Sequence, residues 1–306
     1  MKLKRACFLG ILGSFFFAST FILNRSMHIS GGSWIWSACL RYLFAFPMMA
    51  LIIWKRQGFQ QIHQDIASNP KDWILWSTVG FGFFYAPLCF AGNYGESWLI
   101  ASSWQVTIVM GILLAPMFHT RIEMKNLYAS SIILFGVFLL QKDNIFSLDF
   151  RNTLLTALPI LIASISYPLG NRKTMLLCKN GISTIERTYG MSLCSLPFWL
   201  LMSAFGVIHV GLPSWSQMMQ AFGSALFSGV IATLLFFKAT DLVKSNQRHL
   251  AFVESTQSGE VLFTLLGGVM LLGDVLPDYW GGVGIFLIVF GMILNSLISS
   301  SSKNIE

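Results

Sequence analysis

Ten apolar segments follow one another along the chain, and they restrict its fold more than any other feature. Each is bounded by charged residues, Pro or Gly; they occupy residues 6–24, 34–54, 73–92, 97–117, 125–141, 153–171, 187–207, 218–238, 250–272 and 279–298. A helix that crosses the hydrocarbon core of a bilayer needs ~20 mostly apolar residues. Because unpaired backbone groups are costly in lipid, we predict an all-α integral membrane protein with ten transmembrane helices.

Composition agrees with a lipid environment. Only 11% of the 306 residues are charged and 55% are hydrophobic, whereas a soluble domain carries roughly 25% charged residues. The basic N-terminus followed by an apolar run resembles a signal peptide, but no small-residue cleavage site precedes Asn24. We therefore expect an uncleaved first helix.

The basic residues are divided unevenly between the two ends of the predicted helices. With the N-terminus in the cytoplasm, the inner segments hold 16 Lys and Arg residues and the outer loops hold 3. The inner set is Lys2, Lys4, Arg5, Lys55, Arg56, Lys71, Arg121, Lys125, Arg172, Lys173, Lys179, Arg187, Lys238, Lys244, Arg248 and Lys303; the outer set is Arg25, Lys142 and Arg151. The positive-inside rule thus predicts cytoplasmic termini in the inner or plasma membrane. It also explains the net charge of +7 without a nucleic-acid partner.

Polar residues recur in the two halves of the chain. Ser19 and Ser166 lie 147 residues apart, and each is followed by an Asn-Arg pair. The matched positions are Asn24 with Asn171, Arg25 with Arg172, Arg41 with Arg187, and Gln105 with Gln257. With five helices in each repeat, residues 1–145 and 150–306 would cross the membrane in opposite directions. Inverted repeats of this kind are typical of secondary transporters.

The second half contains a motif that extends from Gln257 to Asp274, with Gly267, Gly268 and Gly273, followed by Trp280-Gly281-Gly282. In this respect the chain resembles the drug/metabolite transporter superfamily with two EamA-type repeats, and within it the multidrug-resistance efflux transporters. Asp274 stands where Glu is more usual, and the first half departs further from the pattern. The resemblance implies a central cavity formed by the first four helices of each repeat, with segments 125–141 and 279–298 at the periphery.

Ionisable residues inside the predicted helices are the first candidates for function, because a charge at that depth costs ~2.5–3.5 kcal/mol on insertion scales. Arg41 lies about ten ångström into its helix, close to the limit of snorkelling, so it could equally bind lipid headgroups or backbone carbonyls. Glu254 and Glu260 point to different faces of one helix. Glu260 is the deeper and is the candidate proton or substrate carboxylate; a structural hydrogen bond is the alternative.

Further polar and aromatic residues complete the predicted pathway. Buried amides bridge helices or bind a polar solute, and aromatic rings at depth can surround a flat or cationic solute. The candidates of these two kinds are Gln105, Gln257, Trp104, Tyr85, Tyr94 and Tyr167. Possible gate residues are Asn24, Arg25, Asn171, Arg172 and Arg187, although Arg187 is also explained as an interfacial charge.

No motif for catalysis is present. The chain has no HExxH, Gly-x-Ser-x-Gly or P-loop, and its five cysteines form no CxxC pair, so we expect no enzyme activity, cofactor or metal. The sequence predicts a secondary active exporter of a small organic metabolite or drug, coupled to protons or another ion, acting as a monomer or homodimer. An importer, exchanger or facilitator of amino acids or nucleotide-linked solutes stays open, as does a non-transporting membrane protein or membrane enzyme.

Overall fold

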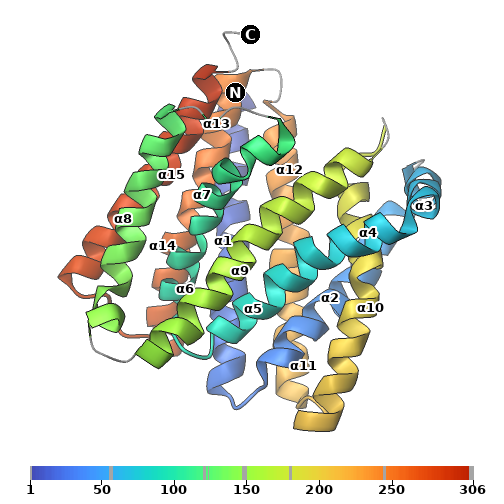
Figure 1. Ribbon diagram of the computed structural model, residues 1–306, viewed down its shortest axis with the longest axis horizontal. Helices are drawn as coiled ribbons and strands as arrows, with labels where there is room; N and C mark the ends of the chain where they lie inside the picture. Colours follow the sequence, from blue (N-terminus) through green and yellow to red (C-terminus); the bar gives the residue numbers. More distant parts are fainter. Residues whose placement is uncertain are drawn as a thin grey trace.

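The computed structural model describes residues 2–302, except 55–57, 120–121, 123, 147–149, 179–180 and 244–245. Within these residues the chain is helical and contains no strand. Both chain ends lie at the same end of the helical bundle (Figure 1); this is called the terminal end below, and the opposite one the far end. The predicted inner residues Lys55, Arg56, Arg121, Lys179, Lys244 and Lys303 lie outside the described residues.

Within the described part of the chain, eight helical segments are long and apolar enough to cross a membrane, so the chain is a multi-pass membrane protein. In chain order they are α1 (Lys2–Ile29), α2 (Trp34–Ile53), α4–η1–α5 (Pro70–Ser77, Thr78–Gly82, Phe83–Ala91), α8 (Met124–Phe146), α9 (Phe150–Leu177), α10 (Thr184–Val210), α11–η3–α12 (Trp215–Ser224, Ala225–Ala232, Thr233–Asp241) and α15 (Tyr279–Ser302).

The other two predicted membrane segments are built from shorter helices. One consists of α6 (Ser97–Trp104), α7 (Val106–Leu113) and η2 (Ala115–Phe118); the other of α13 (Gln247–Ser255), η4 (Thr256–Ser258), α14 (Gly259–Gly267) and η5 (Gly268–Leu272). The first changes to tighter turns at Gln105, whose N–H binds Ser102 O at 3.1 Å. The second does so at η4, a 3₁₀ turn that contains Gln257. Both interruptions therefore fall on the glutamines that the repeat pattern pairs.

Two further irregularities occur at matched positions. The segments η1 and η3 are π-helical turns that begin at Thr78 and Ala225. These residues are 147 positions apart, which is the separation of Ser19 and Ser166. Wide turns of this kind inside membrane helices often mark functional regions, because they leave the regular backbone bonding pattern.

The region between α2 and α4 departs from the sequence prediction, which placed only a loop there. It contains α3 (Gly58–Ser68), at the edge of the bundle. Ile62 of this helix is fully buried, and its side chain lies against Gly190 of α10. The helix forms because its apolar face is covered by α10 while its polar face stays exposed.

The helices α8 and α15 pack side by side along one edge of the bundle (Figure 1), where the family resemblance placed the peripheral pair. Their backbones approach closely at Gly136 and Gly284. A Cβ atom on Gly284 would lie 2.7 Å from Gly136 O, and a Cβ on Gly136 would lie 2.7 Å from Gly284 O. Small residues at such crossings allow the dispersion contacts that hold membrane helices together.

This crossing leads to a matched prediction. We expect Gly284→Ala to lower the stability of the purified protein by about 1–3 kcal/mol, because the added methyl group meets backbone atoms that cannot move away. Gly282→Ala, two residues earlier on the same helix, has open space within 4 Å of its Cβ position and should be neutral or slightly stabilising. Thermal unfolding of both variants in detergent measures the difference. Equal melting temperatures would contradict the close packing of α8 on α15.

Candidate functional site

Arg41 of α2 lies at the centre of a polar network. Its Nη1 donates hydrogen bonds to Thr20 Oγ1 at 2.7 Å, Tyr85 OH at 3.1 Å and Ser224 Oγ at 3.3 Å, and its Nη2 donates to Ser228 Oγ at 2.9 Å. The guanidinium carbon also lies 4.4 Å from the centre of the Tyr85 ring. Among the described residues, the Arg41 guanidinium therefore hydrogen-bonds to side chains inside the protein.

The network joins the two halves of the chain. Thr20 and Tyr85 belong to α1 and α5, whereas Ser224 and Ser228 belong to α11 and η3. Helix α2 comes close enough to η3 for this because small residues face each other; a Cβ on Gly229 would lie 3.5 Å from Ala45 Cβ. All four partners of Arg41 are neutral hydroxyl groups. In the described residues no carboxylate lies within ion-pair distance of Arg41, so its charge is solvated but not neutralised.

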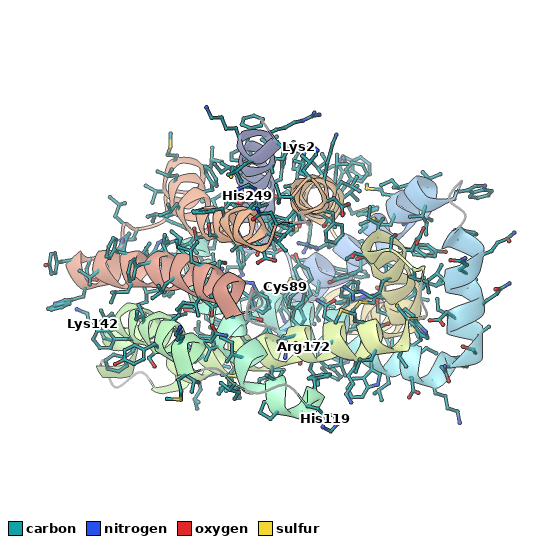
Figure 2. The ribbon with its side chains drawn as sticks, turned by 90° about the horizontal axis from the view of Figure 1, so that it is seen from above. Lys2, Cys89, His119, Lys142, Arg172 and His249 are labelled. Atoms are coloured by element: carbon teal, nitrogen blue, oxygen red, sulfur yellow. The ribbon has the colours of Figure 1, made fainter. Side chains whose placement is uncertain are left out.

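Tyr85 extends the network toward the far end. Its hydroxyl donates to Asn24 Oδ1 at 3.1 Å, and Asn24 Nδ2 contacts Cys89 Sγ at 3.4 Å. Figure 2 shows Cys89 near the middle of the bundle, with Lys2, His119 and Lys142 at its rim. Asn24, a predicted gate residue, thus joins the network through Tyr85 and also lines a small space with Arg25 and Ser97.

Glu260 follows the η4 interruption at the start of α14. Its side chain is partly accessible, and within the described residues no hydrogen bond or ion pair reaches its carboxylate. The charged groups that act on this region are Arg41, whose field reaches Glu260, and Arg187, whose field reaches Tyr167. Glu260 itself acts electrostatically on Tyr167. Glu260 is therefore within electrostatic range of Arg41 and Tyr167, but among the described residues no contact joins its carboxylate to either side chain.

Aromatic rings from both halves of the chain pack against one another around Tyr167. Trp104 of α6 and Tyr167 of α9 have ring centres 5.6 Å apart, and Phe84 lies 4.8 Å from Trp104 and 4.9 Å from Tyr167. Trp104 is buried, and the rings of Phe84 and Tyr167 are partly buried. Trp104 and Tyr167, both candidate pathway residues, therefore pack together on helices from different halves of the chain.

The far end carries a buried ion pair. Arg25 Nε near the end of α1 lies 3.6 Å from Asp274 Oδ1, and the Asp274 side chain is 2% exposed. Asp274 Oδ2 also accepts hydrogen bonds from the Ser97 N–H at 2.9 Å and from the Ser97 hydroxyl. This trio, which we call the far-end latch, connects α1 with the start of α6 and the end of η5. A water-sized space of about 10 Å³ lies beside it.

A larger cavity is found at the terminal end. A cavity of about 250 Å³ lies between α7, α12, α13, η4 and α15, and Glu254, Gln257, Asn295 and Ser296 supply its polar wall. Glu254 is exposed and Gln257 is half-buried. These two predicted pathway residues therefore line a cavity at the terminal end, six and three residues before Glu260 in the chain.

Other candidates lie elsewhere. Gln105 donates to Ala101 O of its own helix at 3.1 Å, and Tyr94 is 39% exposed beyond the end of α5. The Arg172 guanidinium lies 5.5 Å from the Phe118 ring centre. Arg187 has a buried Nε without a hydrogen-bond partner among the described residues. The repeat pairs Gln105 with Gln257 and Arg41 with Arg187 thus do not have equivalent surroundings.

The prediction missed Thr20, Ser224 and Ser228, the hydroxyl groups that bind Arg41. Isolated Ser and Thr residues are common in membrane helices, so no sequence signal distinguished these three from packing residues. The latch partner Asp274 was noticed only as part of a motif. Its location directly after η5, at the same end as Arg25, was the available signal.

The described residues contain no group of three or more His, Cys, Asp or Glu side chains that could bind a metal ion. The five cysteines are free thiols. The site can therefore supply one unneutralised cation, one accessible carboxylate, several hydroxyl groups and an aromatic wall. Such a set can bind a polar solute reversibly and exchange a proton.

A family model named EmrE, described as "Putative multidrug resistance efflux transporter", matches residues 4–301. An uncharacterized protein of Bacillus subtilis (strain 168), YjlA, is 46% identical over 98% of this chain and 96% of its own length. An "Uncharacterized 42.1 kDa protein in intracellular alkaline protease 3'region" of Shouchella clausii is 43% identical over 84% of this chain and 70% of its own length. Neither relative's name states an activity.

Proposed function

Because the chain belongs to the EmrE family of multidrug resistance efflux transporters within the drug/metabolite transporter superfamily, we infer that it is a proton-coupled exporter of a small organic solute. It works by alternating access, with the solute bound between the two halves near Arg41 and Glu260. The observation that carries this proposal is the Arg41 network, in which side chains from both halves of the chain bind one charged group. Arg41, which has no ion-pair partner, and the partly accessible Glu260 carboxylate lie inside an apolar bundle that contains two interrupted helices. Ionisable groups in such surroundings cost free energy, and they are usually kept because they have a function.

The proposal includes ten membrane-crossing segments in two inverted repeats, residues 1–145 and 150–306. The opposite directions of α1 and α9 in Figure 1 support it, as do the matched π turns and the matched helix interruptions. The contacts also correspond: α1 packs on η3, α12 and α14, whereas α9 packs on η1, α5 and α7. The change of direction falls beside residues 147–149, which lie outside the described residues.

The two ends of the molecule support alternating access. The far-end latch leaves about 10 Å³ beside it, while the terminal end has a cavity of about 250 Å³. If the termini are cytoplasmic, as the positive-inside rule predicts, this conformation is open toward the cytoplasm of an inner or plasma membrane. Breaking the latch and closing the terminal cavity would give the outward-open state.

Reconstitution tests this function. We expect proteoliposomes loaded with a cell metabolite extract to release one or more solutes faster than empty liposomes, and we expect a pH gradient to drive that release. Mass spectrometry of the external medium measures the flux. Transport without a pH response would leave a facilitator or exchanger of the same fold, and net uptake would make the protein an importer. No flux for any solute in either direction would contradict a transport function.

A further inference from the structure

The hydroxyl groups around Arg41 are arranged to accept hydrogen bonds from it. The Thr20 hydroxyl donates its own proton to Ser228 Oγ, and the Tyr85 hydroxyl donates to Asn24 Oδ1 at 3.1 Å. A hydroxyl group whose proton is directed to another acceptor presents its lone pairs to the guanidinium. The network therefore solvates the cation with neutral oxygen atoms and supplies no negative charge to balance it.

One edge of the Arg41 guanidinium has no partner among the described residues. Nη1 binds three acceptors, whereas Nη2, which carries two N–H groups, binds one and Nε binds none. The Nε atoms of Arg25 and Arg187 also lack a hydrogen-bond acceptor, but they are buried. Arg41 Nε is not among these buried atoms, and its side chain is partly accessible. The edge formed by Nε and Nη2 is therefore open to a small molecule.

We propose that this edge of Arg41 binds the carboxylate group of a small monoanionic solute. The proposal rests on the transport function above and specifies its substrate class. The N–H groups on Nε and Nη2 are parallel donors, and their spacing matches the two oxygens of a carboxylate. The solute would supply the negative charge that the hydroxyl partners of Arg41 lack.

The orientation of the guanidinium is fixed before a solute arrives. The Tyr85 ring, which is fully buried, covers the guanidinium at 4.4 Å from its central carbon. The bonds from Nη1 to Thr20 and from Nη2 to Ser228 hold the group from two further helical segments. Binding therefore costs little side-chain entropy, which favours affinity for a small ligand.

The charge of the network favours a monoanion over other solutes. Arg41 supplies one positive charge, and the four groups bonded to it are neutral. A monoanion would give a neutral complex, whereas a dianion would leave one unbalanced negative charge in an apolar bundle, which costs free energy. A lipophilic cation beside Arg41 would be repelled in a medium of low dielectric constant.

Binding of matched compounds tests the proposal on the unmodified protein. Acetate, butyrate and benzoate are titrated by ligand-induced thermal shift at neutral pH, each beside its primary amide. Sodium chloride at equal concentration controls for ionic strength. We expect at least one carboxylate to bind about 10- to 100-fold more tightly than its amide, because the amide cannot make the charge-assisted contact. Inorganic phosphate should bind more weakly than that carboxylate.

The proposal is overturned if no carboxylate binds more tightly than its amide, or if phosphate binds more tightly than all three carboxylates. This comparison does not depend on the folding of any variant.

Variants assign the binding to Arg41. Arg41→Gln should abolish the preference for a carboxylate over its amide. Arg41→Lys keeps the charge but lacks the planar fork, so it should lower the preference by about fivefold, the value of one hydrogen bond. Arg5→Gln, which removes an exposed arginine of α1, should bind like the wild type. A preference that persists unchanged in both Arg41 variants would place the carboxylate elsewhere and overturn the proposal.

A separate readout distinguishes this result from failure of the transport function. The solutes that proteoliposomes release from a metabolite extract are sorted by their charge at neutral pH, and we expect carboxylates among them. Release of cations or neutral solutes alone would disprove the carboxylate site while leaving a transporter. Carboxylate binding that depends on Arg41, but without flux of any solute, would support the site and contradict transport.

Discussion

Replacement of Asp274 by Asn should open the far end of the molecule. The substitution removes the charge that pairs with Arg25 but keeps the size of the side chain. Loss of one partner of a buried ion pair costs about 3–5 kcal/mol, and the lower end of that range applies because the Arg25 side chain is 22% exposed. A cost of about 3 kcal/mol shifts the closed-to-open ratio by about 150-fold, so the open state should become easy to detect.

A native cysteine reports this opening. Cys89 is 3% exposed and contacts Asn24, which lines the space beside the latch. In a background with Cys7, Cys39, Cys178 and Cys194 replaced by Ala, we expect Asp274→Asn to increase the rate at which a membrane-impermeant maleimide labels Cys89. Application of the reagent from one side of the membrane also identifies which side the far end faces.

A neighbouring carboxylate provides the control. Asp278 lies four residues after Asp274 and forms an ion pair with Lys142 at 3.1 Å, but its side chain is 50% exposed. The Gly281 N–H and then Lys142 lower the pKa of Asp278, so Asp278 is ionised at neutral pH. Exposed pairs contribute little to stability, so Asp278→Asn should leave Cys89 protected. Equal labelling in both variants would disprove the latch.

Glu260→Gln should uncouple transport from the proton gradient. An amide has nearly the same shape as a carboxylic acid but cannot take up a proton, so a pH gradient would no longer drive net flux. Exchange of labelled for unlabelled substrate at saturating concentration should persist, because that process needs no proton transfer. We expect gradient-driven flux to fall to the level of empty liposomes, while exchange remains measurable with a raised KM.

The matched control is Asp72→Asn, an exposed carboxylate in the first turn of α4, which should keep both activities. The role of Glu260 would be refuted if the variant still accumulated or released substrate against its gradient under the same pH difference. Loss of exchange and gradient-driven flux together, with normal thermal stability, would show that Glu260 binds substrate without carrying the proton.

The comparison of sequence with structure separates two kinds of prediction. The predicted segments 34–54 and 279–298 agree closely with α2 and α15. The length of an apolar segment is a local property of the sequence, and it decides whether that segment can cross a bilayer. Helix α3 was missed because its apolar face is short and depends on α10 to cover it. Glu260 was singled out by its depth alone, but its unbonded carboxylate is a result of how α14 packs. Tyr94 was grouped with the pathway although it lies exposed beyond α5. The sequence does not show whether an aromatic side chain near a helix end points into the bundle or away from it.

The sequence by itself determined that the chain is a membrane protein and where its apolar segments lie. It also identified the few charged residues whose burial in a bilayer costs the most free energy, which made them candidates for function. Only the tertiary structure decided what those charges meet. Arg41 was ambiguous until Thr20, Tyr85, Ser224 and Ser228 came together from four elements, and Arg25 was an exception to the charge rule until Asp274 reached it. The physical reason is that hydrophobicity acts on each segment separately. A buried charge, by contrast, is hydrogen-bonded by groups that are distant in the sequence, and these groups come together only when all the helices between them have packed.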